Sequence, residues 1–202
     1  LHPLYQNNPA HRSPYSPTSR CFLNTLYIDL KQVPNFSTCQ AAQSRFNSDE
    51  IQNKIAYAKQ TELIDYPAVA DIKFDILEIL FQDINNLSLE QQTEFTDFKT
   101  SQGNDLLQLA TFEALYEHFR KIYENSYGWP DWPVAFQAPD SDEVKAFQQT
   151  HSNRINYFCF VQWLAHRQLK SIAVQAKKSG MPIGLYLDLA VGCDGSGVDV
   201  WS

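Results

Sequence analysis

The sequence predicts an α/β protein in which helices far outweigh strands. Four segments between residues 48 and 128 repeat apolar side chains at helical spacing, and a fifth such pattern covers residues 142–179. A short apolar run at residues 181–192 follows directly and is typical of a buried strand. Because a helix that leads into a buried strand is an αβ unit, the pattern indicates a parallel sheet or a (β/α) barrel.

The composition is that of a globular protein. The chain has 202 residues, of which 44% are hydrophobic and 13% aromatic. Its net charge of −7 argues against nucleic acid and anionic membrane as partners. No apolar stretch approaches the length of a membrane span, and no secretory signal opens the sequence. We therefore expect a cytoplasmic protein.

The four cysteines do not form a metal-binding pattern. No CxxC pair is present, and no histidine lies at zinc-like spacing from a cysteine. A disulfide framework is conceivable from the count, but a chain with a full core does not need one, so we favour four reduced thiols. Cys159, in an aromatic helix, is expected in the core. Dinucleotide, phosphate-loop and metalloprotease motifs are absent, so we expect no metal and no cofactor.

The first thirty residues are expected to be mostly irregular. Four prolines fall within residues 1–20, which indicates an ordered loop or a series of turns. Residues 22–30 form a short apolar segment of extended or mixed structure.

Several helix ends carry clear signals. Asp65 is a suitable cap with Pro67 in the following turn, and Ser88 with Gln91 forms a capping-box pattern in a helix that should stop at Gly103. The pattern at 142–179 is too long for one ordinary helix and should break near residues 151–153.

That last helix has a complete C-terminal signature. Lys177 and Lys178 lie in the final turn, Gly180 follows the end, and Pro182 lies beyond it.

The aromatic turn at residues 128–133 has two interpretations. Trp129 and Trp132, held by prolines, could form a platform for a sugar ring, or they could pack between helices. We favour packing, because aromatic side chains mostly serve burial.

Spacing alone identifies little chemistry. His166 and Arg167 lie within the long helix, where a polar side chain is usually solvated or bonded locally. Asp188 lies near the end of the expected strand without a convincing second carboxylate, which glycoside chemistry would require. Asp194 and Asp199 lie in a glycine-rich loop and are expected to be turn residues.

Several motifs in order resemble the amylomaltase (4-α-glucanotransferase) family. They are LHPL (1–4), SPYSPTSR (13–20), FLNTLYI (22–28), LIDYPAVA (63–70), ATFEAL (110–115), GWPDWP (128–133), QWLAHRQL (162–169) and the stretch 184–201. Two positions depart from the family pattern, which often has a basic residue at Leu187 and an arginine at Cys21. Neither change touches the implied chemistry.

The resemblance implies a partial (β/α)₈ TIM barrel dominated by a helical insertion. Residues 1–30 would be a barrel loop and a short extended segment, and residues 31–140 the helical insertion subdomain. Residues 141–202 would be a barrel helix and a strand ending in a Gly-rich loop. The chain would then be a piece of a larger enzyme.

The resemblance also implies an activity and two binding residues. The family moves α-1,4-glucan segments between maltodextrins by a retaining double displacement, using carboxylates that would lie beyond Ser202. No residue of this chain would therefore be catalytic, and the fragment alone should be inactive. Tyr15 matches a tyrosine that stacks on the sugar beside the scissile bond, and Asp188 an aspartate that lines the same subsite. Ser13 and Asn24 would only shape the loop.

Two alternatives stay open from the sequence. The chain could be a non-catalytic helical module that binds glucan or protein, or part of a hydrolase in which water is the acceptor. Exposed apolar strand edges of an open half-barrel would favour self-association.

Overall fold

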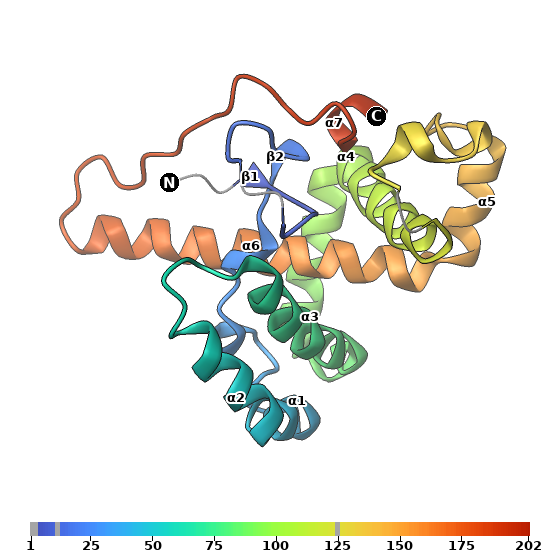
Figure 1. Ribbon diagram of the computed structural model, residues 1–202. Coiled ribbons are helices and arrows are strands. Elements are labelled where there is room, and N and C mark those ends of the chain that lie inside the picture. Colours follow the sequence, from blue (N-terminus) through green and yellow to red (C-terminus); the bar gives the residue numbers. More distant parts are fainter. Residues whose placement is uncertain (1–3, 11–12, 124–125) are drawn as a thin grey trace.

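The computed structural model describes residues 4–10, 13–123 and 126–202, and helices dominate it (Figure 1). The helices are α1 (Gln40–Phe46), α2 (Asp49–Ala58), α3 (Tyr66–Gln82), α4 (Leu89–Ile122), α5 (Asp142–Thr150), α6 (Ser152–Lys178) and α7 (Val198–Trp201). Single 3₁₀ turns lie at η1 (Thr25–Tyr27), η2 (Leu30–Gln32), η3 (Ile84–Asn86), η4 (Trp129–Asp131) and η5 (Val134–Phe136). Strands β1 (Leu4–Tyr5) and β2 (Ser19–Leu23) pair antiparallel as the only sheet of the described residues. Residues 1–3, which belong to the first family motif, lie outside this description.

The predicted helix ends are confirmed. The Asp65 side chain accepts a hydrogen bond from the backbone of Ala68, and Ser88 and Gln91 form a complete capping box. The long C-terminal pattern breaks between α5 and α6, as expected.

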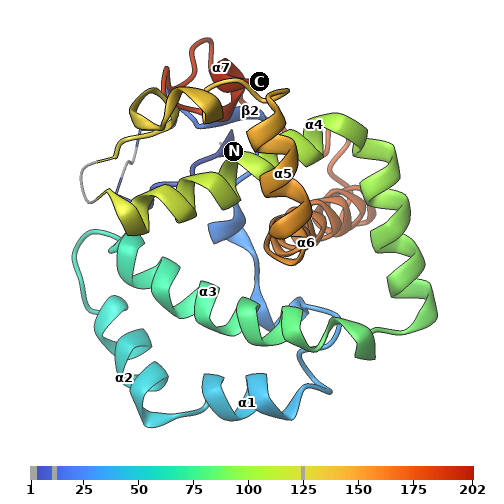
Figure 2. The same cartoon turned by 90° about the vertical axis from the view of Figure 1, so that its right-hand side faces the viewer.

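Gly103 divides α4 into two helical parts. Its φ of 56° and ψ of −133° are not helical, and this φ is one that side-chain-bearing residues rarely adopt. The bend lets the two parts of α4 wrap around α6, which is seen end-on in Figure 2.

Helix α6 is the centre of the molecule. It packs against α3 and α4 (Figures 1 and 2). Trp163, Phe160 and Leu164 on it are at most 1% exposed and belong to the hydrophobic core. Cys159 is buried as predicted, and all four cysteines are free thiols.

Two glutamine side chains of α6 hold the backbone at the end of β2 and just beyond it. Gln162 accepts from the Leu23 amide at 3.2 Å and donates to the Leu23 carbonyl at 2.9 Å. Gln168 makes the same pair of bonds to Asp29, at 2.8 and 2.9 Å. Residues 22–30 have the mixed structure that was predicted, because Phe22 and Leu23 end β2 and the turns η1 and η2 follow.

The predicted strand at residues 181–192 is wrong for this structure. The segment has no regular secondary structure, and Ile183, Tyr186 and Val191 are 83%, 80% and 96% exposed. It passes over the two strands on its way to α7 (Figure 1). A strand requires a backbone partner, and the described strands pair only with each other. The described residues include no helix that is both long and apolar enough to cross a membrane.

Candidate functional site

The motif loop, residues 13–20, is held from inside by Thr18. This side chain is 1% exposed, and its hydroxyl lies 2.7 Å from Gln6 Oε1 and 3.0 Å from Asn7 Oδ1. It also accepts a hydrogen bond from the Asn7 amide at 3.2 Å. The residues that follow β1 therefore fix the motif loop in place.

The C-terminal segment packs against the motif loop. The Asp194 amide donates to the Pro17 carbonyl at 2.8 Å. Arg20 donates from its guanidinium to the Val191 carbonyl at 3.2 Å and from its amide to Asp199 at 2.8 Å. Asp199, which was expected to be a turn residue, lies instead in α7 and joins two segments far apart in sequence.

Gly197 makes the closest approach between these segments. A Cβ at this position would lie 2.5 Å from the Thr18 carbonyl oxygen and 3.0 Å from its Cα. Only glycine allows the two backbones to meet at this distance.

Tyr15 and Asp188 lie on the segments that this packing brings together. Tyr15 is 72% exposed at the tip of the motif loop, and Asp188 is also exposed. A Cβ on Gly192, four residues after Asp188, would lie 3.6 Å from the Tyr15 carbonyl oxygen. The two residues are thus carried by adjoining segments, and both are exposed.

Ser13 and Asn24 shape the loop, as expected. The Ser13 hydroxyl accepts from the Tyr15 amide at 3.4 Å, and Asn24 Oδ1 accepts from the Leu26 amide at 3.0 Å to cap η1. Both line a cavity of about 230 Å³ beneath the motif loop.

Other polar residues singled out in the sequence have local roles. The Asp194 carboxylate accepts from the Ser196 amide at 2.9 Å, which confirms a turn. His166 packs on Phe98, with ring centroids 5.4 Å apart. Arg167 donates to Glu94 at 3.1 Å.

The aromatic turn packs between elements, which confirms the favoured interpretation. Trp132 is 2% exposed, and its ring lies 5.2 Å from Phe112 and 6.2 Å from Trp201, centroid to centroid. Trp129 is half-buried and donates from its indole nitrogen to the Gly195 carbonyl at 3.2 Å. The turn therefore supports the C-terminal segment.

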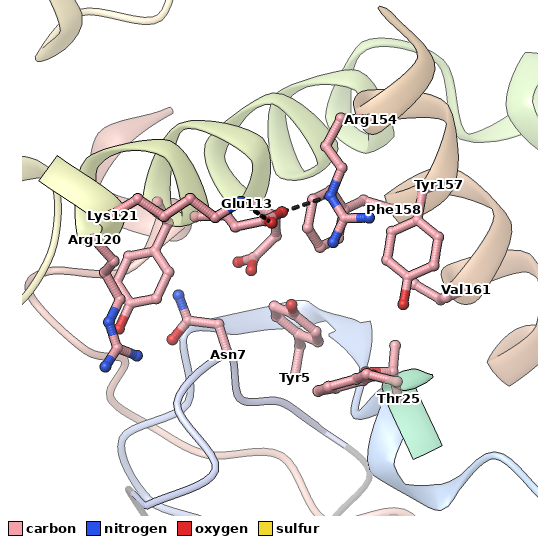
Figure 3. A pocket seen from close by; sticks show the side chains of 13 residues that line it. Tyr5, Asn7, Thr25, Glu113, Arg120, Lys121, Arg154, Tyr157, Phe158 and Val161 are labelled. Atoms are coloured by element: carbon pink, nitrogen blue, oxygen red, sulfur yellow. Dashed lines mark hydrogen bonds and ion pairs between the residues drawn. The ribbon is translucent and has the colours of Figure 1, made fainter. Parts of the chain in front are cut away.

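Sequence reasoning missed a buried carboxyl group, Glu113 of α4 (Figure 3). This residue is 5% exposed, and its burial raises its pKa to about 8 despite Tyr5 and Asn7 within hydrogen-bonding reach. A signal was present, because Leu109 and Tyr116 lie four residues before and three after it on a buried helix face. An acidic residue on an apolar stripe indicates a buried carboxyl group.

An ion-pair network lies beside this group. Arg154 of α6 pairs with Glu78 of α3 and with Glu117 of α4, and Lys121 pairs with Glu117 at 2.7 Å. Burial opposes ionisation of Glu117, but hydrogen bonds from Lys121 and Arg154 outweigh it and lower its pKa. Across the described ranges, no group of three or more His, Cys, Asp or Glu residues is placed to hold a metal ion.

Comparison with known proteins identifies the family. A family model described as 4-alpha-glucanotransferase matches residues 1–202. The chain belongs to the 4-alpha-glucanotransferase family. A 4-alpha-glucanotransferase of Haemophilus influenzae is 35% identical over 209 residues, a match that covers 100% of this chain and 30% of the relative. A Mycobacterium bovis 4-alpha-glucanotransferase is 29% identical, with coverages of 99% and 26%.

Solved structures agree with this assignment. Amylomaltase from Corynebacterium glutamicum superposes with a TM-score of 0.72 at 27% identity, over 98% of this chain and 25% of that structure. Amylomaltase from Streptococcus agalactiae in complex with acarbose gives a TM-score of 0.71 at 18% identity, over 98% and 36%, which shows a shared fold. The chain thus spans about a third or less of the length of these 4-alpha-glucanotransferase family relatives.

Proposed function

We propose that this chain is part of an enzyme that transfers α-1,4-glucan segments between maltodextrins. A carboxylate would attack the anomeric carbon and displace one sugar, and a sugar hydroxyl would then release the glycosyl-enzyme with retention. The observation that carries this proposal is the packing of the motif loop, residues 13–20, against residues 191–199. The acarbose complex of the Streptococcus agalactiae relative supports a glucan-like ligand.

Tyr15 and Asp188 are proposed to line one sugar subsite. The exposed Tyr15 ring offers a flat face to a sugar ring that flattens toward an oxocarbenium ion, and Asp188 would accept hydrogen bonds from sugar hydroxyls. The nucleophile, the acid/base and a third carboxylate are proposed to lie outside these 202 residues. The reaction requires no cofactor.

The proposed architecture is that of the predicted partial barrel. Residues 1–30 would belong to the barrel, residues 31–140 to the helical insertion, and residues 141–202 to a barrel helix and the next strand. Neighbouring strands would supply the backbone partners that residues 181–192 lack among the described residues. The apolar side chains exposed along this segment support self-association of the chain on its own.

A cytoplasmic location is proposed on the basis of the free thiols. Cys21 is exposed and forms no disulfide, an arrangement that is common in proteins of reducing compartments.

Turnover of maltotriose tests the proposed function. The whole protein should convert maltotriose into glucose and longer maltodextrins, and the 202-residue chain should not. In the whole protein, Tyr15→Ala and Asp188→Asn should each lower kcat/KM at least tenfold, whereas Tyr57→Ala, an exposed tyrosine on α2, should not. Turnover by the 202-residue chain itself would contradict the proposed location of the carboxylates, and Asp188 would become the first candidate nucleophile.

A further inference from the structure

An open groove lies between α2 and α3, and residues 27–31 form its third side. Helix α3 packs against α2 and against the turns η1 and η2, so these elements meet around the groove (Figure 1). This α2–α3 groove has a volume of about 450 Å³. Neither Tyr15 nor Asp188 lines it, so it is a site separate from the proposed sugar subsite.

The walls of the α2–α3 groove are mostly apolar. Ile28 and Ile72 are buried in it, whereas Ile55, Ala58 and Val69 are only half-buried. Part of its apolar surface therefore stays open to a ligand. The volume is near the lower end of the range for small-molecule pockets, which favours one aliphatic chain over a lipid with two.

The charged side chains that line the groove are mainly basic. They are Lys31, Lys59 and Lys73, opposed by Asp29 alone. Within residues 4–10, 13–123 and 126–202, none of these lysines forms an ion pair. The Lys31 ammonium lies 5.5 Å from the centre of the Phe46 ring, which holds this cation beside an apolar wall. The groove thus combines an apolar surface with unpaired positive charge.

Lys73 is the most buried of the three cations. Its ammonium donates to the carbonyls of Leu26 and Ile28, which uses two of its three N–H donors. Burial lowers the pKa of Lys73, and the charge of Asp29 opposes this shift only in part. An anion in the groove would stabilise the charged form of Lys73.

The surroundings of the groove disfavour a membrane as the source of that anion. Residues 49–75 contain six acidic and three basic side chains, and the whole chain has a net charge of −7. Asp49, Glu62 and Asp71 are exposed on the elements that border the groove. An anionic bilayer would meet these carboxylates across its surface, whereas a single small amphiphile needs to reach only the lysines.

We propose that the α2–α3 groove binds a free medium-chain fatty acid. Its aliphatic chain would lie against Ile55, Ala58 and Val69, and its carboxylate would lie among the three lysines. The proposal does not depend on the proposed transfer activity, because the groove shares no residue with the sugar subsite.

Calorimetric titration of the whole protein with decanoate tests the proposal. Decanoate should bind in a single site, and hexanoate should bind at least about tenfold more weakly, because each buried methylene contributes roughly fourfold. Decyl glucoside, which has the same chain and an uncharged head, should also bind more weakly. Absence of decanoate binding, equal or tighter binding of decyl glucoside, or binding only to vesicles of anionic phospholipid would each overturn the proposal.

Two matched pairs of variants locate the bound chain and its carboxylate. Ala58→Trp should fill the groove and abolish decanoate binding, whereas Ala56→Trp, at an exposed position of the same helix, should not. Lys31→Met/Lys59→Met should weaken binding about tenfold. Lys54→Met/Lys145→Met, which removes two lysines that are paired with carboxylates elsewhere, should leave it unchanged. Unchanged binding in Ala58→Trp, or equal losses in the two lysine variants, would overturn the proposal.

Isoleucine methyl NMR of the unmodified protein decides the matter if Ala58→Trp does not fold. Decanoate should shift the methyl signals of Ile55 and Ile72 in the groove and leave that of Ile155 in α6 unchanged. Shifts confined to Ile183, in the exposed run, would place the fatty acid there and contradict a site between α2 and α3.

Discussion

Two apolar stretches of this chain contrast in structure. Residues 155–165 of α6 are mostly buried, whereas most of residues 181–191 are exposed. A helix satisfies its backbone hydrogen bonds internally, so α6 needs only apolar surfaces to pack on. An extended run needs another strand, and the described strands pair only with each other. Apolar composition therefore predicts burial only where the backbone is also satisfied.

Truncation of the α6 core should have the largest effect. Trp163→Ala removes a side chain that is 1% exposed, and we expect a loss of about 3–5 kcal/mol in the free energy of unfolding. Urea denaturation measures this loss. A loss below about 1 kcal/mol would show that α6 is not the centre of the core.

The buried carboxyl group should make this core sensitive to pH. Folding raises the pKa of Glu113 from 4.5 to about 8, so the unfolded state releases its proton first as pH rises. The contribution of Glu113 to the free energy of unfolding should therefore be greatest below pH 4.5. It should fall by a few kcal/mol as the pH rises to about 8. Glu113→Gln should flatten that part of the profile in denaturation curves recorded from pH 4 to 9, whereas Glu62→Gln should leave the slope unchanged.

The contact at Gly197 should have an intermediate effect. Gly197→Ala places a Cβ against the Thr18 backbone and should cost about 1–3 kcal/mol locally. Amide exchange should accelerate in residues 13–20 and 191–199 but not in α6. Gly195→Ala is the matched control, because a Cβ there meets nothing within 4 Å. Equal amide-exchange rates in residues 13–20 and 191–199 of the two variants would contradict the close approach of Gly197 to Thr18.

The exposed run should show the smallest effect. Ile183→Ser should change the unfolding free energy of this chain by less than about 0.5 kcal/mol, because the side chain is 83% exposed. In the whole protein the same change should cost roughly 2 kcal/mol if residues 181–192 form the proposed barrel strand. Equally small losses of unfolding free energy in the 202-residue chain and in the whole protein would contradict a strand at residues 181–192.

Local chemistry in the sequence was enough to predict α2 to α6, whereas α1 and α7 were not predicted. The caps at Asp65 and Ser88, the stop at Gly103 and the break near residue 151 depend on neighbours in the chain, so a single sequence records them. The order of family motifs likewise identified the family from sequence.

Only the tertiary structure decided the remaining features. Whether residues 181–192 form a strand depends on distant backbone partners, and periodicity carries no information about those. The buried Glu113 depends on β1 and α6 closing over one face of α4, and the pairing of Arg20 with Asp199 spans almost the whole chain. Such long-range contacts determine which side chains are buried and which charges are paired. The spacing of residues along the sequence does not determine either.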